Sequence, residues 1–321
     1  MACILCGGAR APWLEMPIDA KTRAPTPYGR VERCDACGLG VVAPLPSAAE
    51  VPGFYRLGPD YTHGGRHFAK GEAPSLFDRI RVHIAWRFDR GDAATVERLL
   101  SRVGGREGLR VCDIGSGDGQ LVKAFAERGA DATGVDPDPE AVARGRAAGR
   151  DIRHGAGETL PDTLERGEFD LVVMSHSLEH CLDPVATVRS VYGLLKQGGT
   201  FVCETPNAAC AHFKRFNIVS EMFDAPRHLY YFSPQNLAMT LEKGGMKVTD
   251  RYFCGYARLF SNDWRATENR IRDALAASGR ISSALPPAHS RAQSWRLLAE
   301  TFWADKEAKY DSIGVVGVKA T

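Results

Sequence analysis

Short apolar runs alternate with amphipathic stretches over the C-terminal two thirds of this chain. The run at 169–174, for example, leads into a stretch where apolar residues recur at helical spacing. Such alternation of strands and helices predicts a parallel sheet with helices on both faces. The predicted strands are Arg110–Ile114, Ala132–Val135, Asp151–His154, Phe169–Met174, Thr200–Glu204, Met246–Phe253 and Ser312–Lys319; the helices between them include Gln120–Arg128, Pro184–Leu195 and Pro234–Lys243, with another opened by Pro137 and Pro139.

Residues 49–106 precede this pattern and are interpreted as a linker and helical lid. A glycine- and proline-rich stretch contains Tyr55 and Tyr61, which could either line a ligand site or pack the N-terminal part against the main domain. Helices are expected at Ser75–Phe88 and Asp92–Val103. In the first, apolar residues recur at helical spacing, at positions Leu76, Ile80, Ile84 and Phe88.

Two more helices, Asn262–Ser278 and Arg291–Lys309, are predicted before the final strand. We interpret residues 261–310 as a helical insertion that caps the ligand cleft and contacts the substrate. A dimer face is the alternative, so the oligomeric state stays open between a monomer and a homodimer.

Composition narrows the class of protein. The chain has 321 residues, 44% of them hydrophobic, which suffices for one large α/β domain and a small appendage. A formal charge of +2 is too small an excess of positive charge to indicate binding to nucleic acid. No apolar run reaches the roughly 18–20 residues of a membrane helix, and the N-terminus does not resemble a signal peptide. These features predict a cytoplasmic protein with a small-molecule partner, and neither nucleic acid nor membrane as a partner.

Two C-x-x-C pairs stand out among the nine cysteines: Cys3 with Cys6, and Cys34 with Cys37. Each pair is followed by a glycine, and four thiolates suit a closed, tetrahedral Zn²⁺ site of the structural kind. We therefore expect residues 1–48 to form a zinc-ribbon-like module whose folding depends on the metal. Two disulfides or a redox C-x-x-C are the alternatives, and the expected cytoplasmic location disfavours the disulfides.

A glycine loop follows the first strand of the main pattern, in the arrangement D-x-G-x-G-x-G from Asp113 to Gly119. A dinucleotide site prefers G-x-G-x-x-G, and Asp113 and Asp118 would repel a pyrophosphate. This disfavours an NAD oxidoreductase. A cationic ligand with an amine and a sulfonium fits better, which points to S-adenosylmethionine (SAM). Asp136 ends the next strand, where doubly wound folds place the acid that binds a ribose; a helix N-cap is the alternative.

Five segments in this order resemble class I SAM-dependent methyltransferases, over residues 107–321. They are Asp113–Gly119, Gly134–Asp136, Leu178–His180, Leu194–Gly199 and Arg227–Ser233. The resemblance implies a doubly wound, Rossmann-like sheet of seven strands. The cysteine pairs look like the zinc-ribbon heads of a subgroup that modifies small metabolites and nucleotide-linked sugars.

The same resemblance implies the contacts to SAM. Asp113 and Gly115 would hold its methionine part, Gly117 would let the ligand approach, and Asp136 would bind the ribose. Glu158 and the nearby backbone would flank the adenine, and Ser175 is also expected at the cofactor site. Many relatives carry an aspartate where this chain has Ala156, which shifts the adenine contact toward main-chain groups.

Methyl transfer is an in-line displacement, so the protein chiefly positions the acceptor and removes its proton. His228 is the first candidate for the base and His176 the second, because both follow strands whose carboxyl ends face the same crevice. Tyr230 is a further catalytic candidate. The alternatives are a loop-fixing hydrogen bond for His228 and packing for Tyr230. No catalytic metal is expected, since His63 and His67 lie in a glycine-rich stretch without a helix to align them.

Three other functions stay open. The same fold could use SAM without methylating, through intramolecular cyclisation or transfer of the aminocarboxypropyl arm, and would then release methylthioadenosine. An RNA methyltransferase could also carry a zinc-binding head, but it would need a basic face, and residues 1–105 have only a small excess of basic side chains. A non-enzymatic zinc-ribbon interaction protein would leave the glycine loop without a ligand.

Overall fold

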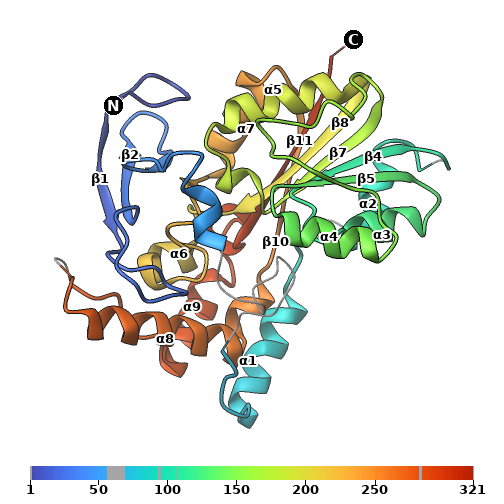
Figure 1. The fold of residues 1–321 in the computed structure, drawn as a ribbon. Coiled ribbons are helices and arrows are strands. Elements are labelled where there is room, and N and C mark those ends of the chain that lie inside the picture. The colour runs from blue at the N-terminus through green and yellow to red at the C-terminus, as the bar shows by residue number, and fades with distance from the viewer. Residues whose placement is uncertain (1, 56–68, 93–94, 106, 282–283, 321) are drawn as a thin grey trace.

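A computed structural model describes residues 2–55, 69–92, 95–105, 107–281 and 284–320 (Figure 1). The main sheet consists of β4 (Arg110–Ile114), β5 (Asp131–Asp136), β6 (Ile152–His154), β7 (Phe169–Ser175), β8 (Leu195–Pro206), β10 (Lys247–Cys254) and β11 (Ser312–Val318). Its strand order is β10-β11-β8-β7-β4-β5-β6. The strands from β8 to β6 are parallel, and β11 runs antiparallel to both of its neighbours. The predicted seven-stranded, doubly wound α/β sheet is confirmed.

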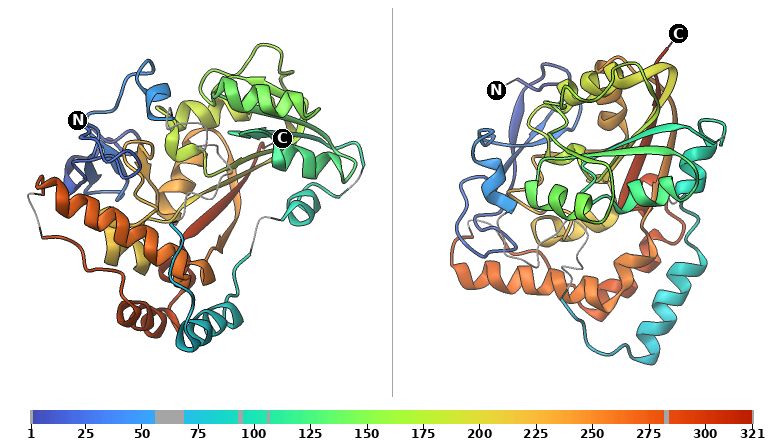
Figure 2. Two further views of the ribbon diagram at one scale, coloured as in Figure 1. Left: turned by 60° about the horizontal axis from the view of Figure 1, so that its bottom comes forward. Right: turned by 45° about the vertical axis from the view of Figure 1, so that its right-hand side comes forward.

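Helices cover both faces of this sheet, because its central strands are apolar on both sides. On one face, Val111, Leu171 and Val173 pack with residues of α2 (Val96–Ser101) and α3 (Gln120–Ala126). On the other face, Cys112, Val172 and Met174 pack with residues of α5 (Pro184–Leu194) and α7 (Pro234–Lys243). A further helix, α4 (Pro139–Ala147), packs against β5 and β6. Figure 2 shows the sheet and the helices that cover it from two further directions.

Three of these helices begin with the same signal, a capping residue followed by proline. Asp138, Asp183 and Ser233 each accept a hydrogen bond from a backbone N–H of the first turn of α4, α5 and α7. Proline at the first helical position loses nothing, since its missing N–H would have no partner within the helix. These caps explain why the predicted starts of α5 and α7 are correct to the residue.

The N-terminal module forms a second sheet that reaches into the main domain. Its strands β1 (Arg10–Glu15), β2 (Arg30–Cys34) and β3 (Gly40–Val42) pair in order, and β3 then pairs with β9 (Tyr230–Tyr231). Gly40 lies opposite Tyr231, where an added Cβ would come within 2.8 Å of the Trp13 ring. The module therefore docks directly on the loop before α7 (Figures 1 and 2).

The remaining helices gather at the lower end of the molecule in Figure 1 or beside the module. The predicted helix 262–278 is confirmed in its full length, whereas the predicted helix 291–309 is interrupted at 302–305, where Asp305 caps a new helix by accepting a hydrogen bond from the Ala308 N–H. The remaining helices, which are not part of the two helical layers on the main sheet, are η1 (Val51–Tyr55), α1 (Leu76–Arg87), η2 (Leu178–His180), α6 (Ala211–Phe216), η3 (Asn217–Val219), η4 (Ala257–Phe260), α8 (Asn262–Ser278), α9 (Arg291–Thr301) and α10 (Lys306–Lys309). Within the described part of the chain, no helix combines the length and apolar character needed to cross a membrane.

The helix α1 differs from the prediction in which side it buries. The apolar positions Leu76, Ile80 and Phe88 are exposed, and the residues that α1 buries are Asp78, Arg81 and Ala85. It packs on η4 and α9, whereas α2 packs on α3 behind the sheet. Of the predicted apolar stripe, only Ile84 is half-buried and packs against the core.

Candidate functional site

The glycine loop leaves a stretch of bare backbone at the carboxyl end of β4. Gly115, Gly117 and Gly119 have φ angles of +80°, +56° and +85°, a region that other residues rarely adopt. An added Cβ on Gly115 would lie 2.1 Å from the Ser177 hydroxyl. The loop thus requires glycine for two reasons. Its backbone adopts positive φ angles, and the Ser177 hydroxyl occupies the space that a side chain at position 115 would need.

Asp113 lies immediately before this loop and is buried. Burial and the nearby charge of Asp136 raise its pKa to about 7. Its carboxylate has no hydrogen-bond partner among the described residues. A buried carboxylate without a partner fits a cationic ligand group such as an ammonium, which would supply the missing charge and hydrogen bonds.

Asp136 holds the glycine loop in place. One of its oxygens accepts a hydrogen bond from the Gly117 N–H at 2.7 Å, and the other accepts from the Asp138 N–H at 2.9 Å. The residue is buried at the end of β5, beside the end of β4. Each carboxylate oxygen has a second lone pair, so hydrogen bonds from a ribose diol remain compatible with this geometry.

The side chains of Glu158 and Ser175 differ in their hydrogen bonds within the protein and in their exposure. The Glu158 carboxylate accepts hydrogen bonds from the N–H groups of Leu182 and Asp183, at 2.5 and 3.3 Å, and so holds the chain that enters α5. Both bonds are to Oε1, so one oxygen of this side chain is engaged by the backbone, a constraint that the sequence did not reveal. Ser175 ends β7 and is exposed, and its carbonyl accepts a hydrogen bond from the Ser177 hydroxyl at 3.1 Å.

His176 forms an ion pair instead of offering a lone pair. Its Nε2 lies 3.3 Å from Oε1 of Glu204, and its Nδ1 lies 3.7 Å from Oε1 of Glu179. Burial lowers the pKa of His176, but the two carboxylates outweigh burial and raise the pKa to about 9. An imidazole that is protonated at neutral pH is a poor proton acceptor, which argues against the base role expected as second choice. Glu204 was not singled out, although it ends a predicted strand at the same edge of the sheet.

Glu179 lies at the centre of a group of imidazole rings. Its side chain is buried, and neither oxygen has a hydrogen-bond partner among the described residues. Its Oε1 is 4.0 Å from Nε2 of His180 and 3.9 Å from Nε2 of His228. Burial alone would raise the pKa of Glu179, but His176, His180 and His228 lower it. Glu179 is therefore a buried anion placed to stabilise a positive charge on any of the three rings.

The tautomer of His228 follows from its hydrogen bond to the backbone. Its Nδ1 lies 2.9 Å from the Met222 carbonyl oxygen, which can only accept, so Nδ1 carries the hydrogen. In the neutral ring the lone pair is then on Nε2, the atom that faces Glu179. This arrangement can take up a proton at Nε2 and stabilise the resulting cation.

His180 lies beside His228 and stays neutral. Their ring centroids are 4.7 Å apart, and burial, together with the neighbouring His228, lowers the pKa of His180 to about 4. Its Nδ1 is 2.9 Å from the Arg227 carbonyl oxygen and 3.0 Å from the Tyr55 hydroxyl. Tyr55 therefore contacts this histidine group, while Tyr61, His63 and His67 lie outside the described residues.

Tyr230 is unsuited to the catalytic role predicted for it. It is buried in β9, and its hydroxyl donates a hydrogen bond to the Leu182 carbonyl at 2.8 Å. Burial raises its pKa well above the usual value. The strand pairing with β3 fixes this side chain as part of the packing, a long-range relationship that the local sequence did not indicate.

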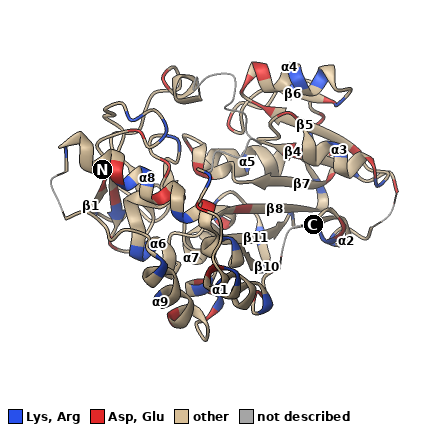
Figure 3. Cartoon of the chain, turned by 90° about the horizontal axis from the view of Figure 1, so that it is seen from below, with Lys and Arg blue, Asp and Glu red and all other residues tan. Residues whose placement is uncertain are grey.

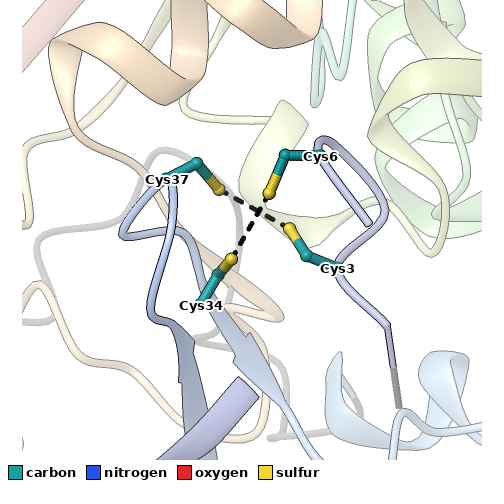
Figure 4. Close-up of side chains that lie close together, drawn as sticks. All are labelled: Cys3, Cys6, Cys34 and Cys37. Carbon is teal, nitrogen blue, oxygen red and sulfur yellow. Dashed lines mark hydrogen bonds between the residues drawn. The ribbon is translucent and has the colours of Figure 1, made fainter. Parts of the chain in front are cut away.

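The four cysteines of the module converge on one point (Figure 4). Their sulfur atoms lie within 4.8 Å of one another; Cys3 and Cys37 are 3.6 Å apart, and Cys6 and Cys34 are 3.4 Å apart. These separations are far beyond the roughly 2.05 Å of a disulfide and near the roughly 3.8 Å edge of a tetrahedral zinc–sulfur site. Gly7 and Gly38, which follow the two pairs, both have φ of +73°. The geometry is compatible with a tetrahedral metal ion.

Two further groups place three metal-ligating side chains within 4.8 Å of one another. The first is Glu179, His180 and His228, described above. The second is His212, Glu268 and His289, which are fully buried between α6, α8 and α9. Glu268 accepts hydrogen bonds from the Trp264 indole at 2.9 Å and from Nδ1 of His289 at 2.6 Å. Nε2 of His212, on α6, lies 3.1 Å from Oε1 of Glu268, but neither ring nitrogen of His212 has a hydrogen-bond partner among the described residues.

Comparison with known proteins matches the region around the glycine loop. Residues 86–250 match the family model described as a methyltransferase domain. The ubiquinone biosynthesis O-methyltransferase of Ruegeria pomeroyi is 32% identical over 190 residues, covering 56% of this chain and 73% of the relative. That of a Methylobacterium species is 32% identical over 173 residues, covering 50% and 69%. A SAM-dependent methyltransferase structure from Archaeoglobus fulgidus has a TM-score of 0.48 at 20% identity, covering 74% of this chain and 94% of that chain.

Proposed function

Because this chain belongs to the methyltransferase-domain family and is a SAM-dependent methyltransferase, we propose that it methylates a hydroxyl group of a small-molecule acceptor. The relatives named as O-methyltransferases support the choice of oxygen and of a small acceptor. The observation that carries the proposal is the position of His228, whose free lone pair faces a buried carboxylate at the carboxyl edge of the sheet.

The residues at the end of β4 and β5 suit SAM. The unpartnered carboxylate of Asp113 would accept the ammonium of the methionine part, and the bare backbone at Gly115 and Gly117 would let the ligand approach. Asp136 would bind the ribose hydroxyls. When bound, SAM supplies a sulfonium methyl group that an oxygen nucleophile can attack.

The acceptor must lose its hydroxyl proton during the transfer. We assign that proton to Nε2 of His228, the one ring nitrogen of this residue not engaged by the backbone. The charge of Glu179 stabilises the imidazolium that forms, without itself contacting the acceptor. His176, held as a cation between Glu179 and Glu204, balances the buried negative charge.

We further propose that the four cysteines of the N-terminal module bind Zn²⁺. A site of four sulfurs leaves no open position, so the metal would be structural. Its effect on activity would be indirect, because the module pairs with β9, three residues or fewer from His228. Under this proposal, the predicted module at 1–48 supports the catalytic residues of the predicted SAM-binding domain at 107–321.

The products test this function. The full-length protein would be incubated with SAM and a panel of phenols, aliphatic alcohols and nucleotide-linked sugars, and the products separated by mass spectrometry. Methyl transfer yields S-adenosylhomocysteine together with an acceptor heavier by one methylene. Methylthioadenosine as the only product from SAM would contradict the proposal and favour cyclisation or aminocarboxypropyl transfer.

A further inference from the structure

The helix α1 presents large apolar side chains to solvent. Leu76, Phe77 and Trp86 are 70%, 69% and 64% exposed, and Ile80 and Phe88 are exposed as well. The helix lies at the periphery of the molecule, at the end farthest from α5 and α7 (Figures 1 and 2). Single exposed apolar residues are common, but a contiguous set on one helix is typical of an interaction surface.

Buried ion pairs on the inner side of α1 fix the rotation of the helix about its axis, so the exposed apolar side chains cannot turn inward. Asp78 and Arg81 are buried and form an ion pair at 2.9 Å, and the Arg81 guanidinium also donates to the Phe260 carbonyl at 3.1 Å. Arg265 and Arg291 contact the same Asp78 carboxylate, at 3.4 and 3.2 Å. Rotating the helix would expose the apolar core beneath it and break these buried contacts, so the outward apolar face is a fixed feature.

The exposed face extends beyond the helix. The Phe88 ring packs against Phe302 with centroids 4.5 Å apart, and the next residue, Trp303, is 88% exposed. We define the α1 face as the exposed residues of this surface: Leu76, Phe77, Ile80, Trp86, Phe88 and Trp303.

Cations accompany these apolar side chains. Arg79 and Arg87 are exposed on α1, and Arg90 is exposed just after it. Within the described helix 76–87, the only carboxylate is that of Asp78, which is buried among arginines. Beyond the helix, acidic side chains flank the face at Glu72, Asp89, Asp92 and Asp305. Figure 3 marks basic positions on α1 and the neighbouring α9, together with acidic ones.

We propose that the α1 face binds the surface of an anionic lipid bilayer. Trp, Phe and Leu side chains beside arginines, on one side of a helix, suit the boundary between headgroups and acyl chains. Arginine stems can lie along apolar surface while their guanidinium groups reach the phosphates. A protein partner would have to match both the apolar residues and the arginines, whereas an anionic bilayer offers both chemistries everywhere on its surface. The helix lies on the membrane in this arrangement and does not span it. This departs from the expectation, made from the sequence, that the protein has no membrane partner.

Vesicle flotation tests the proposal with the full-length protein. The probes are vesicles of phosphatidylcholine alone and of phosphatidylcholine mixed with phosphatidylglycerol. We expect the protein to float with the anionic vesicles, and binding to fall as salt is raised, because each arginine near the surface adds a screened attraction. Absence of flotation with anionic vesicles at low salt would overturn the proposal.

Matched variants locate the contact. The double variant Phe77→Ser/Trp86→Ser should lower the partition coefficient at least about tenfold, because each buried aromatic side chain contributes that much to transfer. Leu45→Ser changes an exposed apolar residue elsewhere and should bind as the unmodified protein does. Equal loss in both variants would contradict the assignment. So would sedimentation showing a stable dimer that Phe77→Ser/Trp86→Ser dissociates, since the face would then join two copies of the chain.

Discussion

Arg227 and Asp19 form a two-pronged ion pair between the main domain and the N-terminal module. Nη1 donates to Oδ2 at 3.0 Å and Nη2 donates to Oδ1 at 2.8 Å. Both side chains are buried, and Arg227 also donates to Asp224. Since Arg227 directly precedes His228, the N-terminal module helps to position the proposed base.

This pairing predicts a large cost for Asp19→Asn. The substitution leaves the buried guanidinium with one carboxylate instead of two, so the free energy of unfolding should fall by about 2–3 kcal/mol. Urea denaturation would measure it. Asp250→Asn is the matched control, because Asp250 pairs with Arg102 at 2.8 Å on the exposed surface, and an exposed pair contributes less than about 1 kcal/mol. Equal losses in the two variants would refute the special role of Asp19.

SAM affinity should depend on pH through Asp113. Its pKa is raised to about 7, so below neutral pH the carboxyl is increasingly protonated and cannot pair with an ammonium. Binding selects the charged form, and the affinity should fall by up to about tenfold per pH unit as the pH drops below 7. Calorimetry between pH 5.5 and 8.5, chosen as about one and a half units on either side of that value, would show it. Asp113→Asn should bind weakly with no such pH dependence; a variant that keeps the slope would exclude Asp113 as its source.

Asp136→Ala should weaken SAM binding about 30- to 100-fold. The change removes the proposed ribose contact and the acceptor for the Gly117 N–H, and charged hydrogen bonds contribute enough for a loss of this size. Calorimetric Kd values would be compared with those of Asp131→Ala, at the exposed opposite end of the same strand. Affinity retained by Asp136→Ala would place the ribose elsewhere.

The cysteine module should carry about one Zn²⁺ per chain. Cys34→Ser should lose the metal and make residues 1–48 more sensitive to protease, because metal binding by the two C-x-x-C pairs contributes to the folding free energy of this module. Elemental analysis and limited proteolysis provide the two readouts. Cys254→Ser, a thiol outside the cluster, should keep both the metal and the resistance. A purified protein free of metal yet resistant to protease would rule out a structural zinc.

Much of the fold follows from local pattern. Apolar runs located the strands of the main sheet, and the predicted starts of α5 and α7 and the predicted end of α8 agree with the structure. Local features account for this agreement: Asp183 and Ser233 cap α5 and α7, and Gly279, with φ of +62°, follows the end of α8. The glycine loop was found because the residues from Asp113 to Gly119 are consecutive, and Asp136 was found because it ends the next strand. These features depend on few long-range contacts.

Other features depended on neighbours that are distant in the chain. The pairing of β9 with β3 joins Tyr230 to Val41, and it turns a predicted catalytic residue into a packing residue. The burial of Asp78 and Arg81 depends on Arg265 and Phe260, which lie beyond the reach of helical periodicity. The carboxylates around His176 made it a cation, which its position after a strand could not indicate.

The role of His228 is the central claim and can be measured directly. Turnover and SAM affinity would be compared for the unmodified protein, His228→Ala and His228→Asn, using an acceptor identified from the panel. Asparagine can still donate a hydrogen bond toward Met222 but has no Nε2, so it separates fixing of the loop from proton transfer. The account predicts that kcat falls at least about 100-fold in both variants while the Kd for SAM stays within about twofold. Turnover by His228→Asn close to that of the unmodified protein would show that His228 only fixes the loop and is not the base.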